Sequence, residues 1–422
     1  ISVAVYSEAD REALHAQIAD EAVCIGPARA ADSYLNMDNI ISAALASGCQ
    51  AIHPGFGFLS ENPDFAERIT QAGLAFIGPT AATIRLMGDK SEAKRNAIAA
   101  GVPVALGTDG PLRDFDEAIS EAKRIGYPVM LKAASGGGGK GIRVALSVKD
   151  LKDAYDSAAA EAVANFGDGR LYMEKYIHNP RHIEVQILGD NYGNVVHLFE
   201  RECSVQRRHQ KLIEECPSAF VTPELREKMT SAAVALAKRV GYRSAGTIEF
   251  LVDNDRNFYF CEMNTRIQVE HPVTEQVTGV DLVCEQLRIA AGEPISFKQE
   301  DLVMRGHAIE CRINAEDPSR NFAPCPGTLV SLHLPGGPGV RVDSAAYQGY
   351  KIPPFYDSMI GKLIVYGSDR TQAIDRMRRA LAETLFEGVV TGTDYQMHIL
   401  CSKAFVDANF NVNSIANGDF DQ

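Results

Sequence analysis

The sequence predicts a protein of mixed α/β and α+β class, and three features of the chain support this assignment. Short apolar strands alternate with helical stretches up to residue 77, which is the order typical of a parallel sheet. A glycine-rich segment at 135–141 joins two further strands. A turn cluster at 253–256 joins the two arms of a β-hairpin. Because 422 residues are too many for one ordinary hydrophobic core, two or three subdomains are expected.

We expect the chain to be organised in four successive parts. They are an N-terminal α/β domain at 1–77, a helical connector at 78–104, a small lid-like domain at 105–176 and a larger mixed region at 177–422. The predicted N-terminal strands are Ile1–Tyr6, Ala51–Ile52 and Ala75–Ile77, and a C-terminal helix is predicted at Thr371–Thr384.

The segment from Glu262 to Glu270 carries the most informative pattern. In an extended strand, successive side chains alternate between the two faces. One face would then hold two carboxylates, two amides and a guanidinium, from Glu262, Asn264, Arg266, Gln268 and Glu270. The opposite face is mostly apolar, so we expect the segment to pack against a core while its polar face binds a ligand. A solvated polar face without a ligand is the alternative interpretation.

A hairpin brings another carboxylate to this face. The strand around Glu249 and the strand leading to Glu262 are joined by the turn at 253–256, which places the two glutamates opposite each other. Opposed like charges destabilise a sheet unless something neutralises them. Mg²⁺ binds carboxylate oxygens together with substrate phosphates, so the pair predicts a divalent metal site. An exposed acidic pair with an arginine nearby is the alternative.

The glycine-rich segment predicts phosphate binding. It contains G-x-G-x-x-G, but a β-branched run replaces the helix that the dinucleotide fingerprint requires, and the sequence has no Walker A motif. The backbone N–H groups of glycines 136–139 are unhindered by side chains and suited to close over phosphates. Lys132 before the segment and Lys140 within it supply positive charge. A surface hairpin without a ligand is the alternative.

Charge and composition argue against several classes of function. The net charge of −13 disfavours a general binder of nucleic acids or anionic membranes. No apolar run approaches the ~18 residues of a membrane span, and no signal peptide is recognised. The nine cysteines are odd in number and lack a C-x-x-C pair. They predict buried thiols in a reducing, cytoplasmic compartment, among them Cys24, Cys49, Cys261 and Cys284.

Several motifs, in the same order, resemble those of the biotin carboxylase family. They are Gly88-Asp89-Lys90, the glycine-rich segment, Met173–Tyr176, Arg181–Glu184, Gln206–Lys211, Glu262–Pro272 and Glu310–Asp317. The resemblance covers essentially the whole chain and is nearest to the stand-alone biotin carboxylase subunit of bacterial acetyl-CoA carboxylase. It implies an ATP-grasp fold with an N-terminal parallel-sheet (pre-ATP-grasp) domain, a mobile glycine-rich lid domain and a large mixed C-terminal domain. In that family a first strand precedes the segment that opens here at Ile1.

The resemblance also implies roles for individual residues. ATP would contact Lys90, Lys132, Gly136, Gly137, Gly138, Gly139, Glu174, Lys175, Ile177, His182, Gln206 and His209. Mg²⁺ or Mn²⁺, at two sites, would be held by Glu249, Glu262 and Asn264. Bicarbonate would lie against Lys211, Arg266, Gln268, Val269 and Glu270. The catalytic groups would be Lys211, Arg266, the general base Glu270, and Arg312, which would bind biotin and stabilise its enolate-like oxygen.

The implied reaction is the ATP-dependent carboxylation of biotin by bicarbonate through carboxyphosphate, the first half-reaction of acetyl-CoA carboxylase in fatty-acid synthesis. The implied partners are a biotin carboxyl carrier protein, carboxyltransferase subunits and a second copy of the chain in a homodimer. A component of another acyl-CoA or pyruvate carboxylase is one alternative. A different ATP-grasp ligase would not be expected to combine Arg266, Gln268 and Glu270 with Arg312, and a non-catalytic nucleotide-binding module would be expected to have lost such groups.

Overall fold

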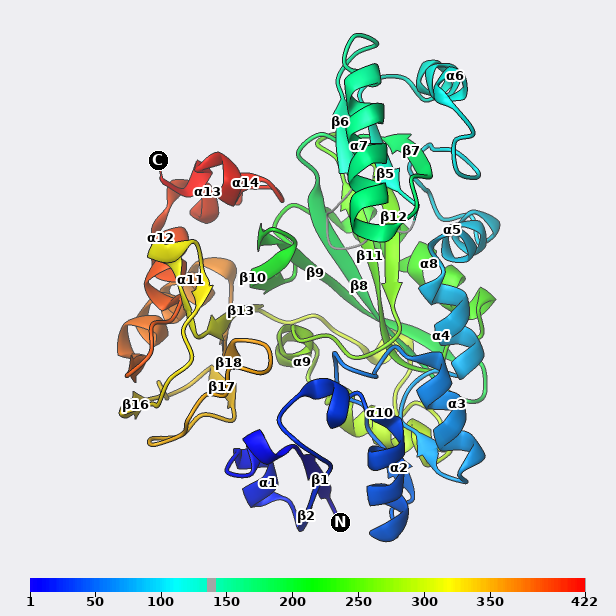
Figure 1. Ribbon diagram of the computed structural model, residues 1–422. Coiled ribbons are helices and arrows are strands. Elements are labelled where there is room, and N and C mark those ends of the chain that lie inside the picture. Colours follow the sequence, from blue (N-terminus) through cyan, green and yellow to red (C-terminus); the bar gives the residue numbers. More distant parts are fainter. Residues whose placement is uncertain (135–141, 422) are drawn as a thin grey trace.

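The structure of the protein is a computed structural model that describes residues 1–134 and 142–421. The glycines Gly136–Gly139 and Lys140, to which the sequence assigns phosphate contacts, lie outside the described residues. Figure 1 shows a small sheet with its helices at the top, a large sheet through the centre and the N-terminal region below it. The class is therefore mixed α/β and α+β, as predicted.

The N-terminal region contains two short pairs of parallel strands, which confirms the predicted parallel pairing. The pairs are β1 (Val3–Tyr6) with β2 (Glu21–Cys24) and β3 (Ala51–Ile52) with β4 (Ala75–Phe76). The helices of this part and of the stretch that follows it are α1 (Leu14–Ile18), α2 (Met37–Ala46), α3 (Pro63–Gln71), α4 (Ala81–Gly88) and α5 (Lys90–Ala99). The side chains of Asn36 and Asn62 cap α2 and α3 by accepting a backbone N–H in the first turn.

A three-stranded antiparallel sheet in the order β6, β5, β7 forms the small domain. Its strands are β5 (Val129–Ala133), β6 (Ile142–Ala145) and β7 (Leu171–Lys175), and its helices are α6 (Phe115–Ile125) and α7 (Leu151–Phe166). Both helices pack against one face through a core that includes Leu131 and Met173. Because side chains alternate along a strand, Lys132 and Glu174 project from the opposite face.

The large sheet has eight antiparallel strands in the order β12, β11, β8, β9, β10, β13, β18, β17. Along the chain these are β8 (Arg181–Gly189), β9 (Val195–Arg207), β10 (Gln210–Cys216), β11 (Ser244–Val252), β12 (Phe258–Asn264), β13 (His307–Asn314), β17 (Val340–Ser344) and β18 (Met359–Gly367). Two small antiparallel pairs flank it, β14 (Glu316–Asp317) with β15 (Ala323–Pro324) and β16 (Ser331–His333) with β19 (Leu385–Glu387).

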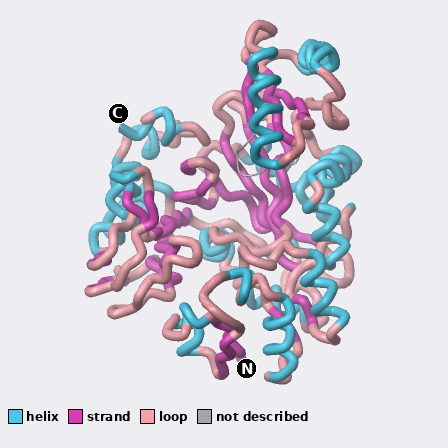
Figure 2. The backbone as a smooth tube through the Cα atoms, in the orientation of Figure 1, coloured by secondary structure: helices cyan, strands magenta, loops and turns pink. Residues whose placement is uncertain are grey.

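Helices cover both faces of the large sheet (Figure 2). The remaining helices are α8 (Pro223–Arg239), α9 (His271–Thr278), α10 (Leu282–Ala290), α11 (Arg370–Glu383), α12 (Thr393–Cys401), α13 (Lys403–Val406) and α14 (Ser414–Asn417). Helix α8 packs on the apolar face of β8 and β11, where Ile183, Ile248 and Phe250 are fully buried. The opposite face of these strands carries buried polar side chains such as Glu184 and Thr247, and α9 lies against it. This polar face holds the site described below.

Two further expectations can be compared with the structure. All nine cysteines are free thiols, but the predicted burial is wrong for Cys24, Cys261 and Cys284, which are exposed, and Cys49 is only half-buried. Strands β2 and β12 are edge strands and α10 has one open side, so apolar neighbours in sequence do not guarantee burial. None of the helices in the described ranges is long and apolar enough to cross a membrane.

Candidate active site

The predicted hairpin forms and places two glutamates opposite each other. Glu249 of β11 pairs directly with Glu262 of β12, which confirms the register expected from the turn at 253–256. On the other side of β11, Glu184 of β8 pairs with Glu249. Glu184 and Glu249 are buried, whereas Glu262 is exposed on the edge strand. Three carboxylates therefore lie in a row across the polar face of the sheet.

The extended segment predicted between residues 262 and 270 is interrupted, so that prediction is wrong in part. Strand β12 stops at Asn264 and α9 starts at His271, so Glu270 is the residue that precedes the helix. Pro272 in the first turn favours this start, because proline lacks the N–H that a first turn leaves without an intrahelical partner. The alternation of faces used in the prediction therefore ends at Asn264.

The polar side chains of this segment nevertheless converge. The Arg266 guanidinium donates to Oε1 of Gln268 at 2.8 Å and to Oδ1 of Asn264 at 3.0 Å. Its Nε donates at 2.8 Å to Glu61, which also accepts the backbone N–H of Thr265 at 2.9 Å. Glu61 belongs to a second glycine-rich loop, at residues 53–62, which follows strand β3 in the N-terminal region. This loop therefore helps to anchor the chain where it leaves the strand.

Lys211 of β10 lies at the centre of the polar face. Its Nζ is 2.6 Å from Glu184, 3.0 Å from Glu249 and 2.6 Å from Glu270. Burial lowers the pKa of an amine, but the three carboxylates outweigh burial and raise the pKa of Lys211 well above its usual value. The ammonium group is therefore charged, and it connects the hairpin carboxylates to Glu270.

Glu270 joins Lys211 to Arg312. Glu270 is 0% exposed, and its second oxygen accepts from Nη2 of Arg312 at 2.8 Å, while Nε of Arg312 donates to Glu214 at 2.6 Å. Burial raises the pKa of a carboxyl group, but the cations, Lys211 first, outweigh burial and hold the pKa of Glu270 below its usual value. Glu270 is therefore an ionised carboxylate, which is the form that a general base requires.

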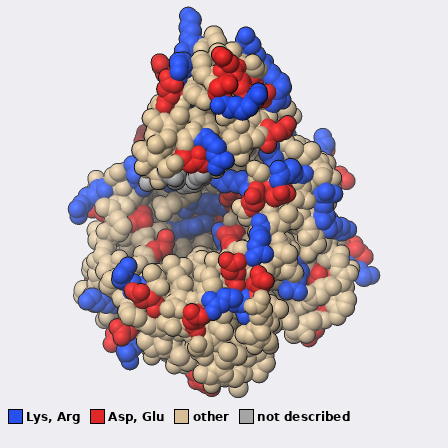
Figure 3. Space-filling view, turned by 45° about the vertical axis from the view of Figure 1, so that its right-hand side comes forward, with Lys and Arg blue, Asp and Glu red and all other residues tan. Residues whose placement is uncertain are grey.

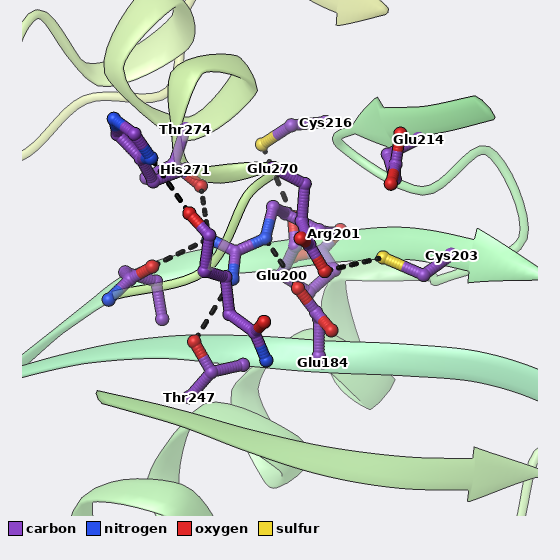
Figure 4. Close-up of polar contacts among 12 residues, drawn as sticks. Glu184, Glu200, Arg201, Cys203, Glu214, Cys216, Thr247, Glu270, His271 and Thr274 are labelled. Atoms are coloured by element: carbon purple, nitrogen blue, oxygen red, sulfur yellow. Dashed lines mark hydrogen bonds and ion pairs between the residues drawn. The ribbon is translucent and has the colours of Figure 1, made fainter. Parts of the chain in front are cut away.

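A second buried cation is Arg201 of β9, whose polar contacts are drawn in Figure 4. The sequence did not predict a role for it. Its guanidinium donates at 2.6 to 3.0 Å to the side chains of Glu184, Gln186, Thr247 and Thr274. These contacts fix Glu184 behind Lys211 and attach α9 to the sheet. A signal for this network was present in Glu200-Arg201-Glu202, three consecutive charged residues that follow the mostly apolar run at 195–199.

Lys362 is a further residue of the site that was not predicted from the sequence, although Val269, which it contacts, was. Nζ of Lys362, from β18, donates at 2.8 Å to the carbonyl oxygen of Val269. This contact holds the backbone just before Glu270. A lysine on a distant strand carries no local signal for such a contact, because the pairing of β13 with β18 alone brings it here.

His182 lies beside the hairpin carboxylates. Its Nε2 is 3.3 Å from Oε2 of Glu249 and 3.7 Å from Oε2 of Glu184. Burial opposes protonation of His182, but the charge of Glu249 outweighs this effect and raises the pKa to about 9. His182 is therefore a cation at neutral pH, on the side of the site assigned to the nucleotide.

Of the three small-domain side chains assigned to ATP, two contact each other and the third points to a loop of its own domain. Nζ of Lys132 is 2.6 Å from Oε2 of Glu174, so these two form an ion pair on the face turned away from α6 and α7. Lys175 instead donates to the backbone carbonyls of residues 126–127, at 2.9 and 2.8 Å. Its ammonium group therefore holds a loop of its own domain, and only its backbone remains for the assigned contact.

The other assigned ATP contacts come from different elements. Lys90 opens α5, and Ile177 follows the end of β7. Gln206 is buried near the end of β9. His209 occupies the two-residue turn between β9 and β10 with Arg208, and both have the positive φ typical of such hairpins. These residues therefore come from separate parts of the fold.

The carboxylates of the hairpin suit a divalent cation. Loss of hydration and the neighbouring charge of Glu249 raise the pKa of Glu262, and a cation between the two would relieve this repulsion. Ligand atoms of His182, Glu184 and Glu249 also lie within 4.8 Å of one another. Glu184, however, is already held by Arg201, and a hard cation prefers oxygen ligands. The Glu249–Glu262 pair therefore fits better than the histidine cluster.

The surface of the molecule is hollowed below the small domain (Figure 3). Lys and Arg atoms are visible deep in this hollow, and Asp and Glu atoms line part of its rim. A basic interior suits an anionic ligand such as a nucleotide or bicarbonate. An acidic rim beside it suits the cation that would accompany phosphates.

Comparison with known proteins gives matches along the whole chain. The matching family models are the biotin carboxylase N-terminal domain at residues 1–84, the carbamoyl-phosphate synthase L chain ATP-binding domain at 89–298 and the biotin carboxylase C-terminal domain at 310–417. The chain is 54% identical to biotin carboxylase 1 of Bacillus subtilis, over 99% of this chain and 93% of that protein. It is 55% identical to a pyruvate carboxylase subunit of Methanothermobacter thermautotrophicus, over 96% of this chain and 82% of that protein.

Solved structures give the same result. The biotin carboxylase complex with β-γ-ATP from Campylobacter jejuni is 50% identical with a TM-score of 0.93, over 98% of this chain and 93% of that one. The biotin carboxylase domain of a thermophilic 2-oxoglutarate carboxylase bound to bicarbonate is also 50% identical, with a TM-score of 0.94 over 100% of this chain and 93% of that one. The fold and the buried network of cations and carboxylates define an ATP-grasp enzyme. Within that class, the chain belongs to the biotin carboxylase family.

Proposed function

We propose that the chain carboxylates biotin on a separate carrier protein, with ATP and bicarbonate, as the biotin carboxylase component of an acetyl-CoA carboxylase. The contact of Glu270 with both Lys211 and Arg312 carries this proposal. One ionised carboxylate touches a cation suited to hold bicarbonate and a second cation suited to act on biotin. A base shared by two such cations suits a reaction in which two substrates meet at one point.

The first chemical step is the activation of bicarbonate, which is a weak nucleophile. Lys211 and Arg266 hold its negative charge, while Gln268 and the backbone of Val269 orient it. Glu270 accepts the bicarbonate proton. The bicarbonate oxygen attacks the γ-phosphorus of ATP and the bond to the ADP oxygen breaks, which gives carboxyphosphate and ADP.

The second step transfers the carboxyl group. Carboxyphosphate breaks into CO₂ and phosphate, and the phosphate accepts the ureido N–H proton of biotin. The deprotonated nitrogen then forms its bond to CO₂. Arg312 stabilises the negative charge that develops on the ureido oxygen of biotin, as donors aimed at a developing oxyanion do.

The nucleotide lies between the small domain and the large sheet in this proposal. Its contacts are Lys90, Lys132, Glu174, the backbone at Lys175 and Ile177, His182, Gln206 and His209. Glu249, Glu262 and Asn264 would hold Mg²⁺ or Mn²⁺, which would neutralise charge on the transferring phosphates. His182, a cation beside Glu249, would contact the same phosphates.

The choice of acetyl-CoA carboxylase rests on the resemblance to its biotin carboxylase subunit and on relatives named biotin carboxylase, such as the Nostoc protein at 56% identity over 97% of this chain. The proposed partners are a biotin carboxyl carrier protein, carboxyltransferase subunits and a second copy of the chain, in the cytoplasm. A biotin carboxylase domain from Hydrogenobacter thermophilus, 51% identical, is described as a dimer in complex with MgADP, ADP and bicarbonate. That description supports a homodimer here.

The experiment is an assay of ADP release with free biotin and bicarbonate added separately and together. We expect full ADP release only with both, and transfer of ¹⁴C from bicarbonate to a biotinylated carrier. Addition of carboxyltransferase subunits from an acetyl-CoA or a pyruvate carboxylase then identifies the acceptor. ADP release that requires an amino acid or ammonia in place of biotin would reject the proposal.

A further inference from the structure

A pair of opposed glutamates lies directly behind Arg312. Glu310 and Arg312 are two residues apart on β13, so both project toward α9. Glu214 of β10 pairs directly with Glu310 across the sheet. This register places their Cβ atoms about 5 Å apart. Both glutamates are 0% exposed, so two carboxyl groups face each other away from the solvent.

The hydrogen bonds of this pair leave three acceptor atoms without a donor. Oε1 of Glu214 accepts from Nε of Arg312 at 2.6 Å. Oε2 of Glu214 and both oxygens of Glu310 have no hydrogen-bond partner among residues 1–134 and 142–421. A buried, ionised carboxylate whose oxygens lack hydrogen-bond donors lowers the free energy of unfolding. One proton on Glu310 would provide the missing donor for Glu214.

The surroundings of Glu310 favour the protonated form. The charged groups that face it are Glu214 from β10, Arg312 on its own strand, Lys362 from β18 and Glu270 ahead of α9. Burial raises the pKa of Glu310 well above its usual value, and Glu214 adds to this effect, while Lys362 offsets only part of it. Burial likewise raises the pKa of Glu214, to about 7.

Lys362, the cation on the neighbouring strand, is occupied elsewhere. Its Nζ donates to the carbonyl of Val269 at 2.8 Å and lies 3.8 Å from Asp343. Apolar side chains are also neighbours of Glu310 on this face, because Ala308 lies two residues before it on β13 and Ile364 of β18 pairs directly with it. Within the part of the chain that the structure describes, Glu310 therefore has no direct counter-ion.

We propose that Glu310 is protonated and donates a hydrogen bond to Glu214, and that this carboxyl–carboxylate pair fixes the guanidinium of Arg312 against Glu270. Glu310 is thus a positioning residue that acts through Glu214. Because Glu310 is neutral, Glu214 is the one ionised carboxylate of the pair. Nε of Arg312 therefore donates to Glu214, and Nη2 of Arg312 continues to donate to Glu270. The inference rests on the proposed roles of Arg312 and Glu270, and two of its three tests need no activity.

The first two tests compare Glu310→Gln with wild type by infrared spectroscopy and by thermal unfolding. A protonated carboxyl band should be present in the wild type and absent from the variant. A carboxyl group that stays protonated in the folded state lowers the free energy of unfolding as pH rises above about 4.5. The reason is that the same group ionises in the unfolded chain above this pH. The melting temperature of Glu310→Gln relative to wild type should therefore increase from pH 5 to pH 8.

Glu215→Gln is the matched control, since Glu215 is the next residue on β10, is buried and accepts from His307 and Arg370. Its replacement should leave the infrared band in place. An unchanged band in Glu310→Gln, or a melting difference independent of pH, would overturn the protonated state. Both results are independent of whether the enzyme carboxylates biotin.

The third test is kinetic and separates positioning from packing. Glu310→Gln retains a donor and should keep kcat for biotin carboxylation within about threefold of wild type. Glu310→Leu removes the donor and should lower kcat about tenfold, the scale of a hydrogen bond to a charged group, with KM for ATP unchanged. Equal kcat for the two folded variants would overturn the positioning role. An inactive wild type with the band intact would reject the proposed function and leave the carboxyl pair standing.

Discussion

Lys211 has the densest set of ionic contacts in the proposed site. A single ammonium group compensates three carboxylates that come from β8, β11 and the residue before α9. Such an arrangement is stable only while the cation is present, because removal of one partner leaves buried charges unpaired. The arrangement of these carboxylates therefore depends on Lys211.

We expect Lys211→Met to lower the free energy of unfolding by about 3–5 kcal/mol, the usual effect of breaking a buried ion pair. Lys403→Met is the control, because Lys403 pairs with Asp407 on the surface and such pairs contribute about 0–1 kcal/mol. Chemical denaturation at pH 7 measures both. Equal stability of the two variants would show that Lys211 does not hold the carboxylates together.

At the scale of the elements, strand β10 connects the site to the C-terminal core. Glu214 faces Arg312, while the next residue, Glu215, projects to the other face and accepts from His307 and Arg370. Burial opposes ionisation of Glu215, but His307 and Arg370 outweigh it and lower the pKa to about 2. One strand thus carries, at adjacent positions, a carboxylate of the proposed site and a carboxylate that binds the C-terminal core.

The lowered pKa of Glu215 predicts a pH dependence of stability. A carboxyl group with a depressed pKa in the folded state stabilises the protein above its unfolded value of about 4.5, and this contribution is lost as pH falls toward 2. Glu215→Gln should therefore melt well below wild type at pH 7, and the difference should shrink between pH 4.5 and pH 3. Thermal unfolding across this range measures it. A difference that is constant with pH would show that Glu215 is not an ionised partner of Arg370.

The sequence predicted local parts of the site better than distant ones. The Glu249–Glu262 pairing follows from one turn and from alternation along two adjacent strands, so it was predictable. The contacts of Lys211 with Glu184 and Glu270 depend on the order of strands in the sheet and on the break after Asn264. Neither follows from local periodicity. The resemblance to a family supplied these residues, but it did not indicate that Arg201 supports Glu184.

At the scale of the whole molecule, the proposed nucleotide lies between two sheets that share no strand, the three-stranded sheet with Lys132 and the eight-stranded sheet with Glu249 and Glu262. A ligand and metal that contact both should stabilise the molecule as a unit, by mass action. Because Glu249 and Glu262 repel each other when no cation is bound, this stabilisation should depend on the metal.

We expect the melting temperature of wild type with ATP and Mg²⁺ to exceed that with ATP and a chelator. Glu262→Lys should lose this metal-dependent shift, since the new ammonium group opposes a cation beside Glu249. Glu293→Lys is the control with the same change of charge, on an exposed loop. A wild-type shift in the Glu262 variant would place the metal elsewhere.

The most direct test of the account is the rate of ¹⁴C-bicarbonate transfer to biotin by Glu270→Gln. The substitution keeps the shape of the side chain and removes the charge that contacts Lys211 and Arg312. We expect ATP binding to persist and carboxylation to fall by about 10²-fold or more, the scale of the loss of a general base. Carboxylation at the wild-type rate in the folded variant would contradict the assignment of Glu270 and with it the proposed site.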